Sequence, residues 1–136
     1  MNKSNQTVEV LKRTRELVAQ GWCQEAFAKT KHGQPCAWSE PEAGQFCISG
    51  AVRRAAYSQG RGNRYELWKR AGDAIRLIVP DFVSWNDEPG RTQQEVLDLL
   101  DRAIAGAGFW ESLWRPTSET PPENLILDVK HVDPGP

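Results

Sequence analysis

The sequence lacks any long run of apolar residues, and this limits the classes of protein to which it can belong. None of its apolar stretches comes near the ~20 residues that a membrane-spanning helix needs. The first residues, MNKSNQTVEVLKRTREL, also lack the apolar segment of a secretory signal peptide. We therefore expect a soluble protein that works in the cytoplasm without a membrane partner.

Cysteine is scarce, with three residues at Cys23, Cys36 and Cys47. An odd number leaves one thiol over in any disulfide scheme, and cytoplasmic thiols stay reduced. Together with His32 these residues have the chemistry of zinc ligands. However, the sequence has no C-x-x-C pair, so the spacing argues against zinc. We predict neither a metal site nor a cofactor.

The common catalytic motifs are missing as well. The sequence has no phosphate-binding G-x-x-x-x-G-K-[ST] loop, no G-x-S-x-G and no H-E-x-x-H. The residues that could form a cysteine nucleophile and its partners are Cys23, His32 and Asp87. Such a nucleophile needs a nearby base and a lowered thiol pKa. We predict no catalytic residue and keep a small enzyme that uses Cys23 as an alternative.

The chain is rich in tryptophan, and its charge is distributed unevenly. Six tryptophans are many for 136 residues, and tryptophan concentrates at binding surfaces as well as in cores. Residues 1–76 hold 13 basic and 7 acidic side chains, whereas residues 77–136 hold 4 and 11. Two interpretations follow: the two halves attract each other in the fold, or the basic half binds an anionic partner.

Hydrophobic periodicity predicts a mainly α fold, a compact bundle of about four helices. The predicted helices are Thr7–Gln20, a second from just after Ser39 to about residue 55, Asn63–Val79 and Gln93–Ala107. In the second helix, Gly50, Ala51 and Ala55 are small enough to let another backbone approach closely. In the third helix, the predicted apolar face comprises Tyr65, Trp68, Ala71, Ile75 and Ile78.

Two segments outside these helices show β character. Residues 22–38 fit a small β-hairpin whose turn is Gly33-Gln34-Pro35, and their first part fits an extension of the first helix equally well. Residues 124–132, NLILDVKHV, alternate in polarity and predict a strand or a docking segment. If that strand joins the hairpin, the fold class becomes α+β. We expect one helical domain over residues 1–108 and a proline-rich tail over residues 109–136.

The stretch SWNDEPGRTQQEV, residues 84–96, is the most densely specified. Thr92 and Glu95 form a capping box at the start of the fourth helix. Asn86 and Asp87 have two interpretations. They bond the backbone of a tight corner so that Trp85 packs inward and is largely buried, or they line a small-ligand pocket beside Trp85.

Three segments carry a resemblance to a known family. They are GWCQEAFA with HGQP after it, FCISGAVRRAA, and WNDEPGRTQQEVLDLLDRAIAGA, and they cover roughly residues 8–107. In this order they resemble an uncharacterised family of small bacterial and phage proteins, a domain of unknown function. The resemblance transfers no activity, but it implies a recurring core and a phage or mobile-element origin. The candidate binding residues taken from that core are Trp22, Cys23, Trp85, Asn86 and Asp87.

A basic segment over residues 53–76 supplies a second candidate site. It surrounds the loop GRGN, whose backbone N–H groups could hold a phosphate between arginine side chains. A pI near 6.1 argues against duplex nucleic acid as the ligand. The candidate anion-binding residues are Arg53, Arg54, Arg61, Arg64 and Arg70.

These observations favour a small non-enzymatic protein that acts through protein–protein contact. The predicted partner is another protein, and the predicted role is that of an inhibitor or regulator of a host system. One alternative is a small enzyme that uses Cys23 or a pocket at Asn86 and Asp87. The other is a binder of nucleotide or nucleic acid through residues 53–76.

Overall fold

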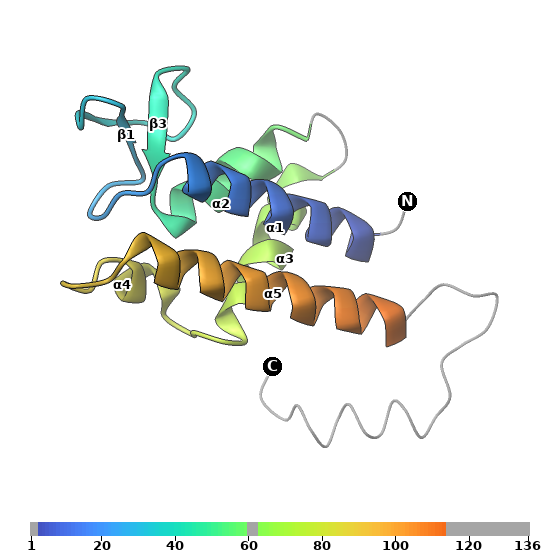
Figure 1. The fold of residues 1–136 in the computed structure, drawn as a ribbon. Helices are drawn as coiled ribbons and strands as arrows, with labels where there is room; N and C mark the ends of the chain where they lie inside the picture. The colour runs from blue at the N-terminus through green and yellow to red at the C-terminus, as the bar shows by residue number, and fades with distance from the viewer. Residues whose placement is uncertain (1–2, 60–62, 114–136) are drawn as a thin grey trace.

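The computed structural model of the chain describes residues 3–59 and 63–113 (Figure 1). The fold is mainly α with a small antiparallel sheet, which confirms the predicted class. In chain order the elements are α1 (Lys3–Gln20), β1 (Ala28–Thr30), β2 (Pro35–Cys36), β3 (Ala43–Phe46), α2 (Ile48–Tyr57), α3 (Arg64–Arg76), α4 (Phe82–Asn86) and α5 (Gln93–Leu113). The predicted strand at residues 124–132 lies outside the described residues.

The core lies where α1 packs against α2, α3 and α5. Helices α1 and α5 lie side by side and run in opposite directions (Figure 1). Burial of aliphatic side chains from all four helices removes apolar surface from water and stabilises the fold. The largest fully buried aliphatic side chains are Leu11, Ile48, Ile75, Leu100, Val10, Val18, Val52 and Val96.

The predicted start of the second helix is wrong. The segment after Ser39 forms a turn and then β3, and α2 begins only at Ile48, with Cys47 as its N-cap. The Cys47 sulfur accepts a hydrogen bond from the backbone N of Gly50 at 3.3 Å. Strand pairing outweighs the local helix signals here, because β3 pairs along its length with β1, and its backbone groups bond there.

The sheet contains the predicted hairpin and one strand more. Strands β1 and β2 lie inside the predicted range 22–38 and pair antiparallel, with Ala28 opposite Cys36. Gly33 in the connecting turn has φ of 87°, a conformation that glycine adopts at little cost. The strand order is β2-β1-β3, so the unpredicted strand β3 covers the other edge of β1.

The third helix begins close to its predicted start, but its buried face differs from the prediction. The side chain of Asn63 caps α3 by accepting a hydrogen bond from the backbone N of Glu66 at 3.0 Å. Leu67 joins Ala71 and Ile75 in the interior, whereas Tyr65 is 57% exposed. The helix is therefore rotated relative to the predicted face, because its packing against α1 and α2 selects the Leu67 side.

The connection from α3 to α5 holds a short helix, α4, that the hydrophobic pattern did not predict. Helix α5 extends to Leu113, beyond the predicted end at Ala107. Gly106 and Gly108 do not end it, because an interior glycine costs only about 1 kcal/mol and keeps its N–H donor. Within the described residues, no helix is both long and apolar enough to cross a membrane.

Candidate functional site

Asn86, the last residue of α4, lies in the interior with only 1% of its surface exposed. Its Oδ1 accepts hydrogen bonds from the indole Nε1 of Trp22 at 2.8 Å and the backbone N of Ile48 at 3.1 Å. Its Nδ2 donates to the backbone O of Cys23 at 3.2 Å and to Oδ1 of Asp87 at 2.9 Å. These four bonds use the whole capacity of a side-chain amide. We call these five residues the Asn86 junction.

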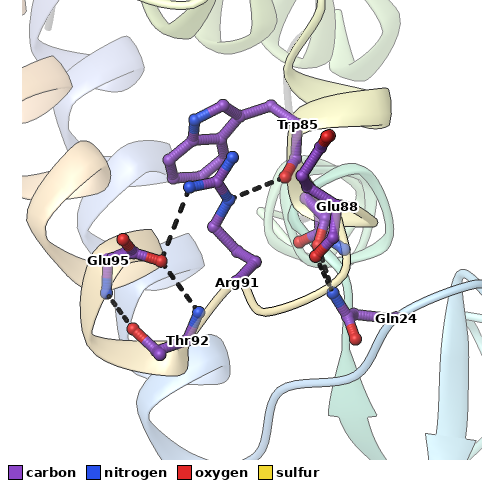
Figure 2. Close-up of polar contacts among 7 residues, drawn as sticks. Gln24, Trp85, Glu88, Arg91, Thr92 and Glu95 are labelled. Carbon is purple, nitrogen blue, oxygen red and sulfur yellow. Dashed lines mark hydrogen bonds and ion pairs between the residues drawn. The ribbon is translucent and has the colours of Figure 1, made fainter.

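The loop after α1 is fastened to the same junction. Oδ1 of Asp87 also accepts a hydrogen bond from the backbone N of Glu25 at 2.9 Å. The side chain of Gln24 donates to the backbone O of Asn86 at 3.0 Å and to that of Glu88 at 2.9 Å (Figure 2). Glu25 has φ of 65°, which costs energy for a residue other than glycine. The hydrogen bonds to α4 help to hold this loop conformation.

Arg91 completes the corner between α4 and α5 (Figure 2). Its guanidinium lies 3.9 Å from the ring centroid of Trp85, and its Nε donates to the backbone O of Trp85 at 2.8 Å. Trp85 is partly buried and packs against the hydrophobic core, in the direction that the structural interpretation predicts. Arg91 covers its ring, and Asn86 is the side chain that lies fully in the interior.

The predicted capping box at the start of α5 is confirmed (Figure 2). The hydroxyl of Thr92 accepts a hydrogen bond from the backbone N of Glu95 at 3.1 Å, and Oε1 of Glu95 accepts one from the backbone N of Thr92 at 2.9 Å. The bond from this backbone N–H is the main reason why the pKa of Glu95 is lowered from its ordinary value. Such a cap contributes about 1 kcal/mol to the stability of a helix.

The contacts of Asn86 and Asp87 match their structural interpretation, because both side chains form hydrogen bonds with backbone groups of neighbouring segments. No buried side-chain nitrogen or oxygen in the described part of the chain lacks a hydrogen-bond partner. A ligand at Asn86 would have to displace bonds that join three separate segments of the protein. The binding role of Trp22, Cys23, Trp85, Asn86 and Asp87 stays a prediction, while their contacts identify a structural role.

Cys23 and Cys47 lie in surroundings that suppress thiolate formation. Burial, with a smaller contribution from Cys47, raises the pKa of the Cys23 thiol to about 12, and burial also raises the pKa of Cys47. His32, the base considered for Cys23, lies exposed in the turn between β1 and β2. These surroundings are the reverse of what a cysteine nucleophile needs. Across residues 3–59 and 63–113, no cluster of three or more His, Cys, Asp or Glu residues is placed to hold a metal ion.

We expect the three thiols to react with iodoacetamide in the order of their exposure. Near neutral pH, Cys36 should be modified first, because Cys23 and Cys47 are buried. A rise in pKa from 9.0 to about 12 lowers the thiolate fraction of Cys23 about a thousandfold at neutral pH. Peptide mass spectrometry over time measures each site, with urea-unfolded protein as the control in which all three react. Alkylation of native Cys23 at the rate of an unfolded thiol would contradict this expectation.

A second group of residues gathers around Arg53 on α2. Its guanidinium lies 4.5 Å from the ring centroid of Trp68, 5.8 Å from that of Phe27 and 5.9 Å from that of Trp38. Two further ring contacts extend the group, from Trp38 to Tyr57 at 5.5 Å and from Tyr65 to Trp68 at 5.4 Å. The aromatic–arginine face consists of Phe27, Trp38, Arg53, Tyr57, Tyr65 and Trp68.

The sequence does not reveal this face as a unit, because its residues are far apart along the chain. Its residues come from the segment before β1, the turn between β2 and β3, and helices α2 and α3. The surplus of tryptophan was the signal that pointed to a binding surface, but it could not indicate which tryptophans meet. Of its residues, only Arg53 was a predicted binding residue, for an anion, whereas Tyr65 and Trp68 were assigned to the apolar face of a helix. Phe27 and Tyr65 are 50% and 57% exposed, so apolar ring surface of this face contacts solvent.

Most of the other candidate anion-binding arginines have partners within the protein. Nη1 of Arg54 donates to the backbone O of Trp38 and of Glu40, both at 2.8 Å. Arg64 donates to the backbone O of Tyr57 at 3.4 Å, and Arg70 forms an ion pair with Glu66 at 3.1 Å. Arg61 lies outside the described residues. The two halves of opposite charge meet elsewhere, where Arg15 on α1 donates to Asp101 on α5.

The fold and these contacts define a small, mainly helical domain with a three-stranded sheet, an internal polar junction and an exposed aromatic–arginine face. The family model of DUF6197, a family of unknown function, matches residues 3–106. This is more than half of the chain, which therefore belongs to that family, and the predicted resemblance to an uncharacterised domain is confirmed. No curated protein and no solved structure matches the chain.

Proposed function

We propose that the protein is a binding module that contacts another protein through the aromatic–arginine face. The observation that carries the proposal is Arg53 lying between the rings of Trp68, Trp38 and Phe27 at a partly exposed surface. Tryptophan, tyrosine and arginine are the residues that dominate binding energy at protein interfaces. The regulatory or inhibitory role predicted from the sequence would be exercised through this surface.

The face is held in place before any partner binds. The backbone O of Phe27 accepts a hydrogen bond from the backbone N of Cys47 at 3.2 Å, which fixes the segment that carries the Phe27 ring against the start of α2. The ring contacts around Arg53 restrict the rotamers of a long side chain. Ordering of such side chains costs about 0.5–1.5 kcal/mol each on binding, and a preorganised face avoids part of that cost.

The chemistry of the face indicates the kind of partner it fits. The exposed rings of Phe27 and Tyr65 offer apolar and aromatic area, and Arg53 offers a planar cation that pairs well with a carboxylate. We therefore infer a partner surface with apolar or aromatic side chains around an acidic one.

Stacked aromatic rings with arginine can also bind single-stranded nucleic acid, so the test must separate the two classes of partner. The contacts favour a protein, because Arg54 and Arg70 donate to groups within the chain. Binding to nucleic acid would weaken steeply with salt and disappear after nuclease treatment.

The proposal predicts that Phe27→Ser and Tyr65→Ser weaken partner binding while leaving the fold intact. The full chain serves as bait in a host lysate treated with nuclease, and the captured protein is then purified for calorimetric titration. Each face variant should weaken binding at least about tenfold, or ~1.4 kcal/mol. Val83→Ser is the matched control, since Val83 is 49% exposed and does not belong to the face.

Two results would overturn the proposal. The first is equal binding of the partner by the wild type, both face variants and the Val83→Ser control. The second is a bound species that nuclease removes, with no protein retained, which would make the chain a nucleic-acid binder. Thermal melts of all four proteins show whether each variant is folded, so a lost fold cannot be mistaken for a lost partner.

A further inference from the structure

An apolar groove lies between α3 and α5, apart from the residues of the aromatic–arginine face. Its volume is about 290 Å³, and it is lined mainly by small and aliphatic side chains. Leu77 on its rim is 58% exposed. The lining residues are Ala74, Leu77, Ile78, Arg102, Ala103, Gly106 and Ala107. The volume lies just below the ~300–1,000 Å³ of small-molecule pockets, so the groove suits a few aliphatic side chains.

We propose that residues 124–132 of this chain, NLILDVKHV, dock in the groove between α3 and α5. This segment stands apart from the proline-rich sequence around it, because it has no proline and five of its nine residues are apolar. In an extended chain, alternate side chains point to the same side, so Leu125, Leu127 and Val129 would enter the groove together. The residues between them, Ile126 and Asp128, would face away from its floor.

The chain leaves the described structure at the correct place for this docking. Gly106 lies seven residues before Leu113, so about 10 Å of helix separates the groove from the end of α5. Residues 114–123 connect α5 to the docking segment, and ten extended residues span up to about 35 Å. The connection is therefore long enough to turn back along α5 without strain.

The groove also offers a cation to the acidic side chains of the segment, which carries Lys130 in addition. Arg102 lines the groove, and Asp128 lies in the middle of the proposed docking segment, with Glu123 just before it. An acidic side chain at the edge of the groove would meet this cation while the neighbouring leucines fill the apolar part. The inference does not depend on the proposed function, because it uses neither the aromatic–arginine face nor a second protein.

Hydrogen–deuterium exchange of the full chain tests the docking. In dilute wild-type protein, the amides of residues 125–131 should exchange more slowly than expected for an unstructured peptide of the same sequence. In Gly106→Glu this protection should be lost, because the new charged side chain occupies the apolar groove that Leu125 and Leu127 would enter. A side chain at Gly106 meets no atom within 4 Å of its Cβ, so the variant should fold.

Gly108→Glu is the matched control. Gly108 lies on the same helix with the same open space around a new Cβ, but it does not line the groove, so protection should persist. Leu127→Asp changes the docking segment instead of the groove, and it should also remove the protection of residues 125–131. The proposal is overturned if wild-type residues 125–131 exchange freely or if Gly106→Glu leaves them protected. Protection that is lost on dilution also overturns it, and would identify a second copy of the chain as the occupant.

Discussion

Replacement of Asn86 with aspartate should lower the free energy of unfolding by about 3–5 kcal/mol, the cost of an uncompensated buried charge. The exchange keeps the shape of the side chain but removes the Nδ2 donor. The new oxygen would then face the backbone O of Cys23 and Oδ1 of Asp87, the two acceptors that Nδ2 now serves. With 1% of the residue exposed, water cannot relieve this repulsion.

The pH dependence of this variant has a definite sign. Burial and the neighbouring acceptors raise the pKa of the introduced carboxyl above its unfolded value of about 3.9. The charge contribution to the destabilisation is therefore complete above the folded pKa, shrinks as the pH falls, and is lost below about pH 4. A smaller loss remains there, because the protonated carboxyl has one donor for the two acceptors that Nδ2 serves. Urea titrations followed by circular dichroism, on wild type and variant at several pH values, measure this difference.

Asp87→Asn is the matched control for Asn86→Asp, since it makes the opposite exchange at the neighbouring position. With its amide oxygen in place of Oδ1, Asn at position 87 still accepts the bonds from Asn86 and the backbone N of Glu25. It should therefore cost much less, within about 1 kcal/mol. If Asn86→Asp were as stable as this control, the junction would not hold the corner together.

Gly50→Ala should be the second large effect, with a loss of about 1–3 kcal/mol or more in the free energy of unfolding. A Cβ at Gly50 would collide with the backbone O of Phe27, which a flexible side chain could avoid but a backbone cannot. Relief of the collision would move the segment before β1 away from α2. That movement would break the hydrogen bond from the backbone N of Cys47 to Phe27 O at 3.2 Å.

The same substitution at Gly108 separates this collision from the general effect of alanine in a helix. Gly108 has no atom within 4 Å of a new Cβ, so Gly108→Ala should stabilise the protein by about 0.5–1 kcal/mol. Thermal and urea denaturation of both variants gives the comparison. Equal stability of Gly50→Ala and wild type would contradict the close approach of Phe27. In that case α2 and the strand segment would be less tightly packed than the structure shows.

Features that depend on neighbouring residues could be predicted from the sequence. The end of α1 at Gln20, the Asn63 start of α3, and the capping box of Thr92 and Glu95 follow from side chains a few residues away. The same is true of the turn at Gly33 between β1 and β2. The small residues Gly50, Ala51 and Ala55 also indicated that another backbone approaches this helix closely, but they did not indicate that Phe27 meets Gly50.

Only the tertiary structure decided which distant groups meet. Strand β3 forms where a helical turn was predicted, because its backbone pairs with β1. Leu67 is buried on α3, whereas Tyr65, which was predicted to be buried, is exposed. Asn86 forms hydrogen bonds with Trp22, 64 residues away in the sequence, and with Ile48, 38 residues away. Arg53 contacts aromatic rings from three other segments. Local sequence sets the preference of each segment for helix, turn or strand. It does not set which segment closes on which, because that choice depends on the burial and hydrogen bonding of the whole chain at once.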